Sequence, residues 1–433
     1  MVDAATAETR TAQQRVRDVP ARVVVYLLLA GCLFEKMGYR QVWDRLVSGL
    51  DELVVPNPTA GALTQARRRL GAKPLRWLFD LLRGAAATTL STVANGTYWR
   101  GLLVCAIDGT IMSVADSTAN LSVYAKQRGG ATGSSSYPML RLVALVACGT
   151  RSVIDAVFGP ISNGETTYTP ALLRSLRAGM LLLADRNFAA GALLAAIAAT
   201  EADFLVRVKT GQGAPKLPAL RRLHDGSYLS VFGGISVRVV DAEIIIATKT
   251  GQSTGAYRLI TTLLDPRRYP AFDLVKLYHE RWEIETAYLE LKSSILGGRV
   301  LRARTPDGVA QEVYALLITY QILRTAMADA TNTQPGVDPD RASFTHALNA
   351  ARDLVVQAAG IIADTIIDLI GGIGRLVLNN LMPDRRVRTK ARTVKRAISK
   401  YNARGPDINR TTYQATIAIA ILSAPNSTTG PEP

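Results

Sequence analysis

The sequence has few of the residues from which thiol and imidazole metal sites are built. It contains three cysteines and three histidines among 433 residues. Cys32, Cys105 and Cys148 lie far apart within apolar stretches. Neither a disulfide framework nor a zinc site, which needs closely spaced ligand pairs, is therefore expected. We predict three buried cysteines that behave as small apolar residues.

Long uninterrupted apolar runs are also missing. Val23–Phe34 is too short to cross a bilayer, and acidic and basic residues interrupt the apolar stretch Ile361–Leu378. The opening residues are polar and mixed in charge, unlike a secretory signal. We expect no membrane partner and a cytoplasmic, nucleoid-associated location.

Acidic residues are outnumbered, with 35 Asp and Glu against 51 Lys and Arg and a net charge of +16. This surplus favours a polyanionic partner, of which nucleic acid is the commonest, over a basic protein that is merely kept soluble by its charge. Apolar residues make up 48% of the chain, which is enough for a sizeable core and two or three domains.

The two ends of the chain are predicted to be helical regions with basic edges. Residues 1–19 are expected to be a disordered leader, and 20–95 a helical DNA-binding domain. Its basic edge carries Arg67, Arg68 and Arg69, for which a solvated charged face is the alternative interpretation. Residues 301–404 form a C-terminal helical region whose basic segment includes Lys395 and Arg396. Residues 405–433 are a tail that is disordered at its end.

The middle of the chain alternates between strand and helix patterns. Residues 98–208 give three strands, a helix, a strand, a helix and a strand, and 263–300 add a long helix. Residues 209–262 form a β-rich insertion between these parts. We therefore predict an α/β fold with a mixed-sheet core, a β-rich insertion and helical flanks.

Two aspartates directly follow strong apolar strand runs. Asp108 comes after 101–107, and Asp185 after 180–184. A carboxylate at such a place is costly to desolvate unless it is paired or bound to a metal. Each aspartate alone would more often be a turn or capping residue.

The predicted helix Phe272–Leu296 carries one polar stripe. At 100° per residue, Tyr278, Arg281, Glu285 and Lys292 lie within about 60° of one another. Geometry therefore selects Glu285 among the nearby glutamates. Alone, Arg281 and Glu285 would be an ordinary surface pair; the two strand-end aspartates favour a site.

A second stripe on the same helix is apolar and should face the core. Its members are Leu277, Ile284, Tyr288, Leu291 and Ile295. Glu283 and Glu290 point away from both stripes and are expected to be solvated.

Asp108, Asp185 and Glu285 together make an oxygen-only ligand set. Such ligands suit Mg²⁺ or Mn²⁺, and two ions of this kind serve phosphoryl transfer by activating the attacking oxygen and stabilising the leaving one. Tyr278, Arg281 and Lys292 would then bind DNA phosphate, with Arg281 as the bidentate donor.

These motifs resemble a known family. The spacing Tyr278-x2-Arg281-x3-Glu285-x6-Lys292 is similar to the YREK signature of bacterial insertion-sequence DDE transposases of the IS-four family. Asp108-Gly109-Thr110 and Asp185-Arg186-x-Phe188 look like that family's first and second acidic motifs. Several stretches between 20 and 404 also resemble it.

The resemblance implies a ribonuclease H-like core and cut-and-paste transposition by strand nicking, hairpin formation and strand transfer. It implies that Asp108 bridges two ions, that Asp185 and Glu285 each hold one, and that Tyr278, Arg281 and Lys292 position the transposon end. The expected partners are terminal inverted repeats and target DNA, bound by a homodimer. Three alternatives stay open: a ribonuclease H-like metal-dependent endonuclease, a non-catalytic DNA-binding protein derived from a transposase, and a basic helical scaffold.

Overall fold

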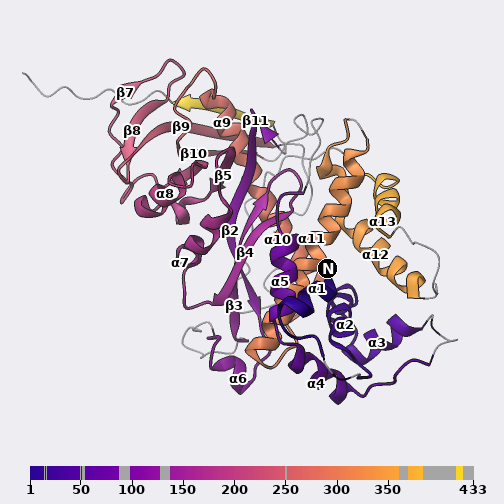
Figure 1. The fold of residues 1–433 in the computed structure, drawn as a ribbon. Helices are drawn as coiled ribbons and strands as arrows, with labels where there is room; N and C mark the ends of the chain where they lie inside the picture. Colours follow the sequence, from indigo (N-terminus) through magenta and orange to yellow (C-terminus); the bar gives the residue numbers. More distant parts are fainter. Residues whose placement is uncertain are drawn as a thin grey trace, which may run out of the picture. The chain divides into compact units, whose positions relative to one another are not determined.

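The chain forms two compact units in a computed structural model. The first comprises Met1–Ser175 and Arg281–Pro383, and the second Leu176–Glu280 and Asp384–Pro433. The structure describes residues 1–13, 15, 17–48, 50, 54–86, 98–126, 137–248, 251–334, 336–359, 369–383 and 416–422 (Figure 1). Each unit is described by itself.

The first unit contains an antiparallel ladder. Its strands are β1 (Tyr98–Trp99), β2 (Leu102–Ser113), β3 (Met139–Ala147) and β4 (Val153–Pro160). The sequence placed Asp108 at the end of a strand, but β2 continues past it, with Asp108 opposite Ala144 of β3. The apolar run ends at Ile107, whereas backbone pairing with β3 does not. Asp108 and Thr110, two residues apart, therefore lie on the same face of β2.

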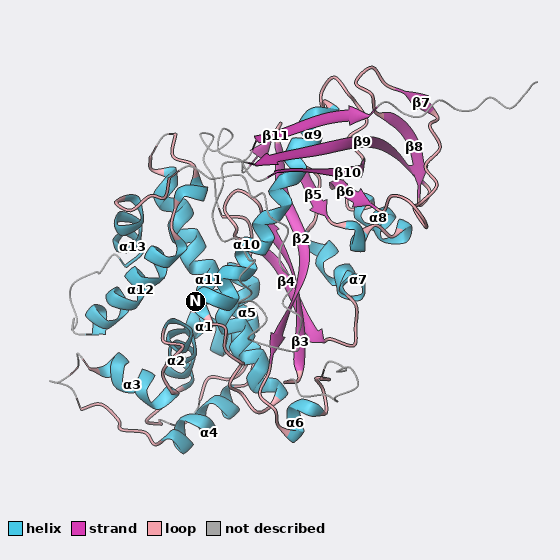
Figure 2. Ribbon diagram, turned by 180° about the vertical axis from the view of Figure 1, so that it is seen from behind, coloured by secondary structure: helices cyan, strands magenta, loops and turns pink. Residues whose placement is uncertain are grey.

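Helices from both ends of the chain build the rest of this unit. The N-terminal ones are α1 (Val2–Glu8), α2 (Ala21–Leu33), α3 (Tyr39–Val47), α4 (Ala60–Leu70) and α5 (Lys73–Leu82). The C-terminal ones are α11 (Pro306–Asn332), α12 (Phe344–Ala359) and α13 (Leu369–Leu378). The long helix α11, capped by Thr305, packs against α2, α5, α12 and α13. Figure 2 shows α11 and the N-terminal helices in one bundle.

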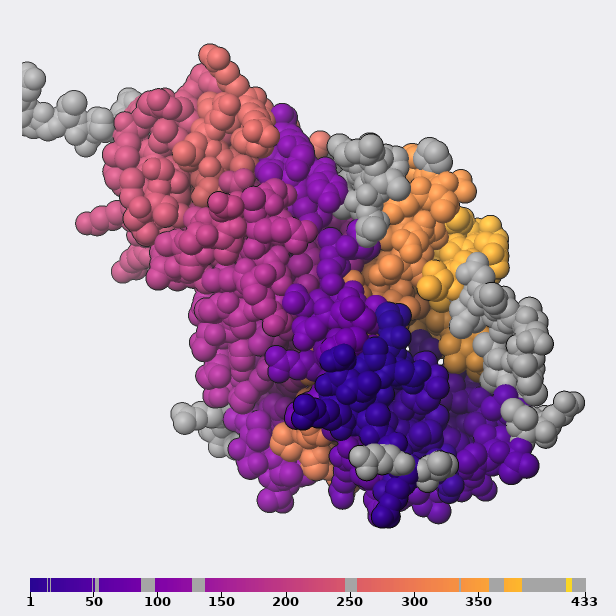
Figure 3. Space-filling view, viewed as in Figure 1, coloured from indigo at the N-terminus to yellow at the C-terminus, as the bar shows by residue number. Residues whose placement is uncertain are grey.

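The expected disordered leader contains a packed helix. Helix α1 contacts α2 and α5, and Ala5 is 0% exposed. The sequence did not predict this helix, because its buried face consists of small residues such as Ala5 and therefore gives only a weak apolar periodicity. Figure 3 shows the N-terminal residues, in indigo, as part of the packed surface of this unit.

The second unit is built on strands of both directions. Strand β5 (Met180–Ala184) is parallel to β6 (Asp203–Val208), and α8 (Gly191–Ala198) connects them. The next strands are β7 (Arg221–Arg222), β8 (Tyr228–Phe232), β9 (Ile235–Thr248) and β10 (Gly251–Thr261). They continue this sheet in antiparallel fashion in the order β5-β6-β10-β9-β8-β7. Strand β11 (Thr416–Leu422), which the sequence did not predict, pairs with β9.

The fold class is therefore confirmed: it is mixed α/β, with sheets of mixed strand direction, a helical N-terminal region and C-terminal helices. None of the three cysteines forms a disulfide; Cys105 and Cys148 are buried as expected, whereas Cys32 is only half-buried. Within the described residues, no helix has the length and apolar character needed to span a bilayer.

Candidate active site

The helical segment that carries the polar stripe changes form along its length. It runs through α9 (Ala271–Tyr278), a 3₁₀ turn η4 (His279–Trp282), α10 (Glu283–Leu289) and a π-turn η5 (Glu290–Ile295). The sequence predicted one uniform helix here. All five residues of the predicted apolar stripe are buried, which confirms the core face.

In the first unit, two of the three predicted carboxylates meet at one guanidinium. Arg281 Nη1 lies 3.6 Å from Asp108 Oδ2, and Arg281 Nη2 lies 3.4 Å from Glu285 Oε1. The side chains of Asp108 and Glu285 are 18% and 17% exposed, so both charges are partly shielded from water yet reachable. Strand β2 supplies one acid and α10 the other, and Arg281 holds them together.

Lys292 belongs to the same arrangement. Its Nζ donates to Thr110 Oγ1 at 3.2 Å, and Thr110 shares a face of β2 with Asp108. Three of the four residues of the predicted polar stripe, Arg281, Glu285 and Lys292, therefore face β2. An anion approaching this face would meet two cationic side chains beside two carboxylates.

Tyr288 fixes the backbone beneath Asp108. Its hydroxyl donates to the carbonyl oxygen of Asp108 at 2.6 Å and accepts from the amide of Ala144 at 3.0 Å. Burial, followed by the charge of Asp108, raises the pKa of Tyr288 well above its ordinary value. The sequence placed Tyr288 in the core but did not foresee this link. A tyrosine in place of phenylalanine on an apolar stripe is the available signal, because its hydroxyl needs a partner.

Gly109 leaves room for the side chain of Glu165 on the face of β2 opposite Asp108. A Cβ atom at this position would lie 2.4–2.6 Å from side-chain atoms of Glu165, which pairs with Arg141 at 3.1 Å. The amide of Gly109 also donates to Asp108 Oδ1 at 2.8 Å. A larger residue than glycine at the middle of Asp108-Gly109-Thr110 would therefore clash with Glu165.

Asp185 and Tyr278 lie in the second unit. Asp185 directly follows β5 and caps the turn η3 (Arg186–Phe188), where its Oδ1 accepts from the amide of Asn187 at 2.8 Å. The buried Tyr278 donates its hydroxyl to the carbonyl of Ala184 at 3.1 Å. Tyr278 is therefore bonded to the residue that precedes Asp185.

The expectation that Glu283 and Glu290 are solvated was wrong. Glu283 is 0% and Glu290 8% exposed. Arg151 binds Glu283, and Arg324 binds Glu290. Helix α11 covers this side of the segment, and the arginines make burial of the acids possible.

The predicted DNA-binding arginines of α4 differ in their surroundings. Arg68 and Arg69 are exposed, whereas the side chain of Arg67 is only 13% exposed. Arg67 lies 3.7 Å from Glu312 and stacks over the ring of Tyr39. Lys395 and Arg396 lie outside the described residues.

Two protein-family models match this chain, one over the N-terminal helices and one over the residues that form the site. Residues 1–80 match the model described as insertion element 4 transposase N-terminal, and residues 99–322 match the transposase DDE domain. The chain belongs to the insertion-element-4 family of DDE transposases. The second match spans Asp108, Asp185 and Glu285 and makes this DDE transposase an enzyme of DNA transposition.

Two transposases of Escherichia coli (strain K12) are similar to this chain in sequence. This DDE transposase is 26% identical over 420 residues to the transposase InsG for insertion sequence element IS4 of Escherichia coli (strain K12), covering 93% of this chain and 91% of the relative. It is 32% identical over 127 residues to the putative transposase InsZ of the same organism, covering 29% and 42% of the two chains. A piggyBac transposase synaptic complex with hairpin DNA is similar with a TM-score of 0.43 at 12% identity, covering 90% of this chain and 83% of that one.

Proposed function

We propose that this transposase moves an insertion sequence by cut-and-paste transposition, and that Asp108, Asp185 and Glu285 hold the divalent ions, two Mg²⁺ or Mn²⁺, that the reaction uses. The observation that carries the proposal is the meeting of Asp108 and Glu285 at Arg281. Two carboxylates from distant parts of the chain converge there on a cation, with oxygen atoms of the kind that hard dications prefer.

Support for Asp185 as the third ligand comes from the second unit and from the chain itself. Tyr278 bonds to Ala184, next to Asp185, and Arg281 follows Tyr278 by one turn of the segment. Asp185 also lies within the residues that match the transposase DDE domain, at the place where the family's second acidic motif is expected.

Each residue of the site would have its own task. The three carboxylates bind the ions, which when bound supply the activation of a water or 3′-hydroxyl and the neutralisation of phosphate charge. Arg281 and Lys292 bind the phosphodiester. Tyr278 was expected to position the transposon end, but its buried hydroxyl is bonded to Ala184, so we assign it to holding the strand end next to Asp185. Tyr288 keeps the backbone of Asp108 fixed while these charges rearrange.

The partner we propose is double-stranded DNA, in the form of terminal inverted repeats and then target DNA. Arg68 and Arg69 on α4 are exposed and suit phosphate contacts, with Lys395 and Arg396 as further proposed contacts. We assign Arg67 instead to packing, because Glu312 and Tyr39 engage it. Two copies acting together on two ends would form a synaptic homodimer.

The test is a reaction of the purified protein with duplex DNA that carries the terminal repeats flanking its gene. Nicked, hairpin and target-joined products are separated on gels after addition of Mg²⁺. Glu285→Gln should lower nicking by about a thousandfold or more. Asp353→Asn, an equal charge change at an exposed residue of α12, should leave it unchanged.

The competing functions give different products. Nicking without any joined product would identify a metal-dependent endonuclease. Binding without nicking in Mg²⁺ or Mn²⁺ would identify a non-catalytic DNA-binding protein. Nicking that survives Glu285→Gln would refute the assignment of the site.

A further inference from the structure

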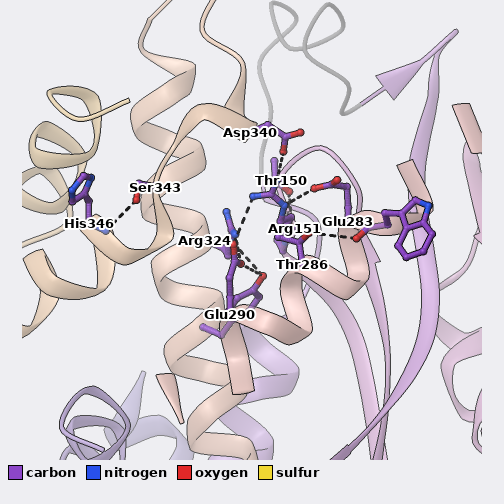
Figure 4. A network of polar contacts seen from close by, with 12 residues as sticks. Thr150, Arg151, Glu283, Thr286, Glu290, Arg324, Asp340, Ser343 and His346 are labelled. Carbon is purple, nitrogen blue, oxygen red and sulfur yellow. Dashed lines mark hydrogen bonds and ion pairs between the residues drawn. The ribbon is translucent and has the colours of Figure 1, made fainter. Parts of the chain in front are cut away.

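A buried network of charges holds the segment that bears Arg281, Glu285 and Lys292. Figure 4 shows Arg151 placed between Glu283 and Asp340, and Arg324 beside Glu290. Arg151 Nε lies 2.5 Å from Glu283 Oε2, and Arg151 Nη2 lies 2.8 Å from Asp340 Oδ1. Arg151 and Arg324, from two other parts of the first unit, thereby bind this one segment, and Asp340 binds Arg151.

The π-turn η5 is the best-anchored point of the network. Its first residue, Glu290, binds Arg324 and accepts from the Tyr320 hydroxyl at 3.0 Å, both on α11. Arg151 Nη1 also lies 3.7 Å from Glu290 Oε1. The network therefore holds the segment two residues before Glu285 and again five residues after it, at the start of the turn that carries Lys292.

Stability alone is a poor explanation for these buried charges. A buried ion pair contributes little net stability compared with well-packed apolar residues, since both charges lose their hydration. Arg151 also adopts φ 56°, a left-handed conformation that is costly for a residue with a side chain. What the network can supply is a defined geometry.

A defined geometry matters here because the segment is not a regular helix. It passes from 3₁₀ turn to α-helix to π-turn within 279–295, and π-turns are rare and frequently found at functional sites. Backbone hydrogen bonding of one regular type cannot then set the directions of Arg281, Glu285 and Lys292. Side-chain anchors on the opposite side of the segment can do so.

We propose that Arg151 and Arg324 are positioning residues for transposition: through Glu283 and Glu290, they aim Arg281, Glu285 and Lys292 at β2. This inference rests on the proposed role of Glu285 and deepens it. Both arginines bind glutamates that lie outside the polar stripe, so their effect on the site passes through the segment.

The test compares Arg324→Met with Arg174→Met in the full-length protein. Arg174 pairs at 2.8 Å with the fully buried Asp155, which keeps Arg83 as a second partner, just as Glu290 keeps Arg151. Both variants thus remove one guanidinium from a buried carboxylate of the first unit, but only Arg324 touches the segment. Arg324→Lys is a second variant that retains the charge.

Two readouts separate positioning from folding. Hydrogen–deuterium exchange of 281–295, measured without metal or DNA, should speed up in Arg324→Met and stay at the wild-type rate in Arg174→Met. Nicking in Mg²⁺ should fall by about 10- to 100-fold in Arg324→Met, with partial recovery in Arg324→Lys. Thermal melting of both methionine variants shows whether their stability loss is equal.

Unchanged exchange of 281–295 in Arg324→Met would overturn the proposal whatever happens to nicking. Faster exchange with undiminished nicking would overturn the link to the reaction. If the wild-type protein nicked no DNA, the proposed function would fail, while the exchange rates would still decide whether the arginines hold the segment. If Arg324→Met does not fold, Arg324→Lys must show both effects in weaker form or the proposal is wrong.

Discussion

At the residue scale, the buried Tyr288 connects the core to the candidate metal ligand Asp108. Its hydroxyl is the common partner of Asp108 on β2 and Ala144 on β3. Since burial raises its pKa well above the ordinary value, it remains a protonated donor throughout the neutral range. A phenylalanine would fill the same space and leave two backbone groups without this partner.

We predict that Tyr288→Phe lowers the free energy of unfolding by about 1–3 kcal/mol, the usual cost of leaving buried polar groups unpaired. Nicking should fall further than stability explains, because the backbone of Asp108 is no longer fixed. Urea unfolding and nicking assays measure the two effects. Tyr137→Phe at an exposed position is the control, and equal behaviour of the two variants would contradict the account.

Gly109 gives a second prediction at this scale. Gly109→Ala should destabilise the protein by about 1–3 kcal/mol, because its Cβ would overlap Glu165. Shortening the neighbour in Glu165→Ala/Gly109→Ala should recover part of that loss. A double-mutant cycle from urea unfolding measures the coupling, and strictly additive effects would show that Glu165 is not the obstacle.

At the element scale, the segment 271–295 shows what a sequence can and cannot predict. Its apolar stripe was predictable because side-chain periodicity depends only on local spacing. The burial of Glu283 and Glu290 was not, since their partners Arg151 and Arg324 lie 132 and 34 residues away. The changes from 3₁₀ to α to π form were not predicted either, because the apolar periodicity there fits one uniform helix.

For the strands too, features set by the local sequence were predictable, and features set by distant partners were not. The bounds of β5 were readable from a continuous apolar run, Met180–Ala184. The extension of β2 beyond Asp108 depended on pairing with β3, which local polarity does not reveal. Strand β11 depends on β9, far away in the sequence.

Helix α1 supplies the prediction for this scale. Ala5→Glu should destabilise the protein by about 2 kcal/mol or more, because it places a carboxylate where α1 is fully buried. Ala4→Glu, an adjacent exposed position, should have little effect. Thermal melting compares the two. Equal melting temperatures would mean that the leader is not packed in solution.

At the scale of the whole molecule, the charge of +16 sets how the transposase meets DNA. Phosphate contacts release counterions, so affinity should fall steeply as salt rises. Composition predicted this property directly. It did not reveal which arginines face solvent, and Arg67 shows that a basic cluster can include a residue committed to internal packing.

We predict that Arg68→Ala/Arg69→Ala reduces the slope of log affinity against log salt by about 2, since each phosphate that an arginine neutralises adds about 0.9 to this slope. Arg67→Ala should instead lower the melting temperature, because Glu312 loses a buried partner. Binding titrations over a range of salt concentrations measure the slope. An unchanged slope in the double variant would move the DNA-binding surface away from α4.

The central claim is that Asp108, Asp185 and Glu285 are ligands of hard cations. Replacement of each by cysteine offers a softer ligand, which Mn²⁺ accepts more readily than Mg²⁺. The decisive measurement is nicking by Asp108→Cys, Asp185→Cys and Glu285→Cys in each metal, beside the corresponding serine variants. We predict inactivity in Mg²⁺ and partial recovery in Mn²⁺ for the cysteine variants alone. Full activity of any cysteine variant in Mg²⁺ would contradict its role as a ligand.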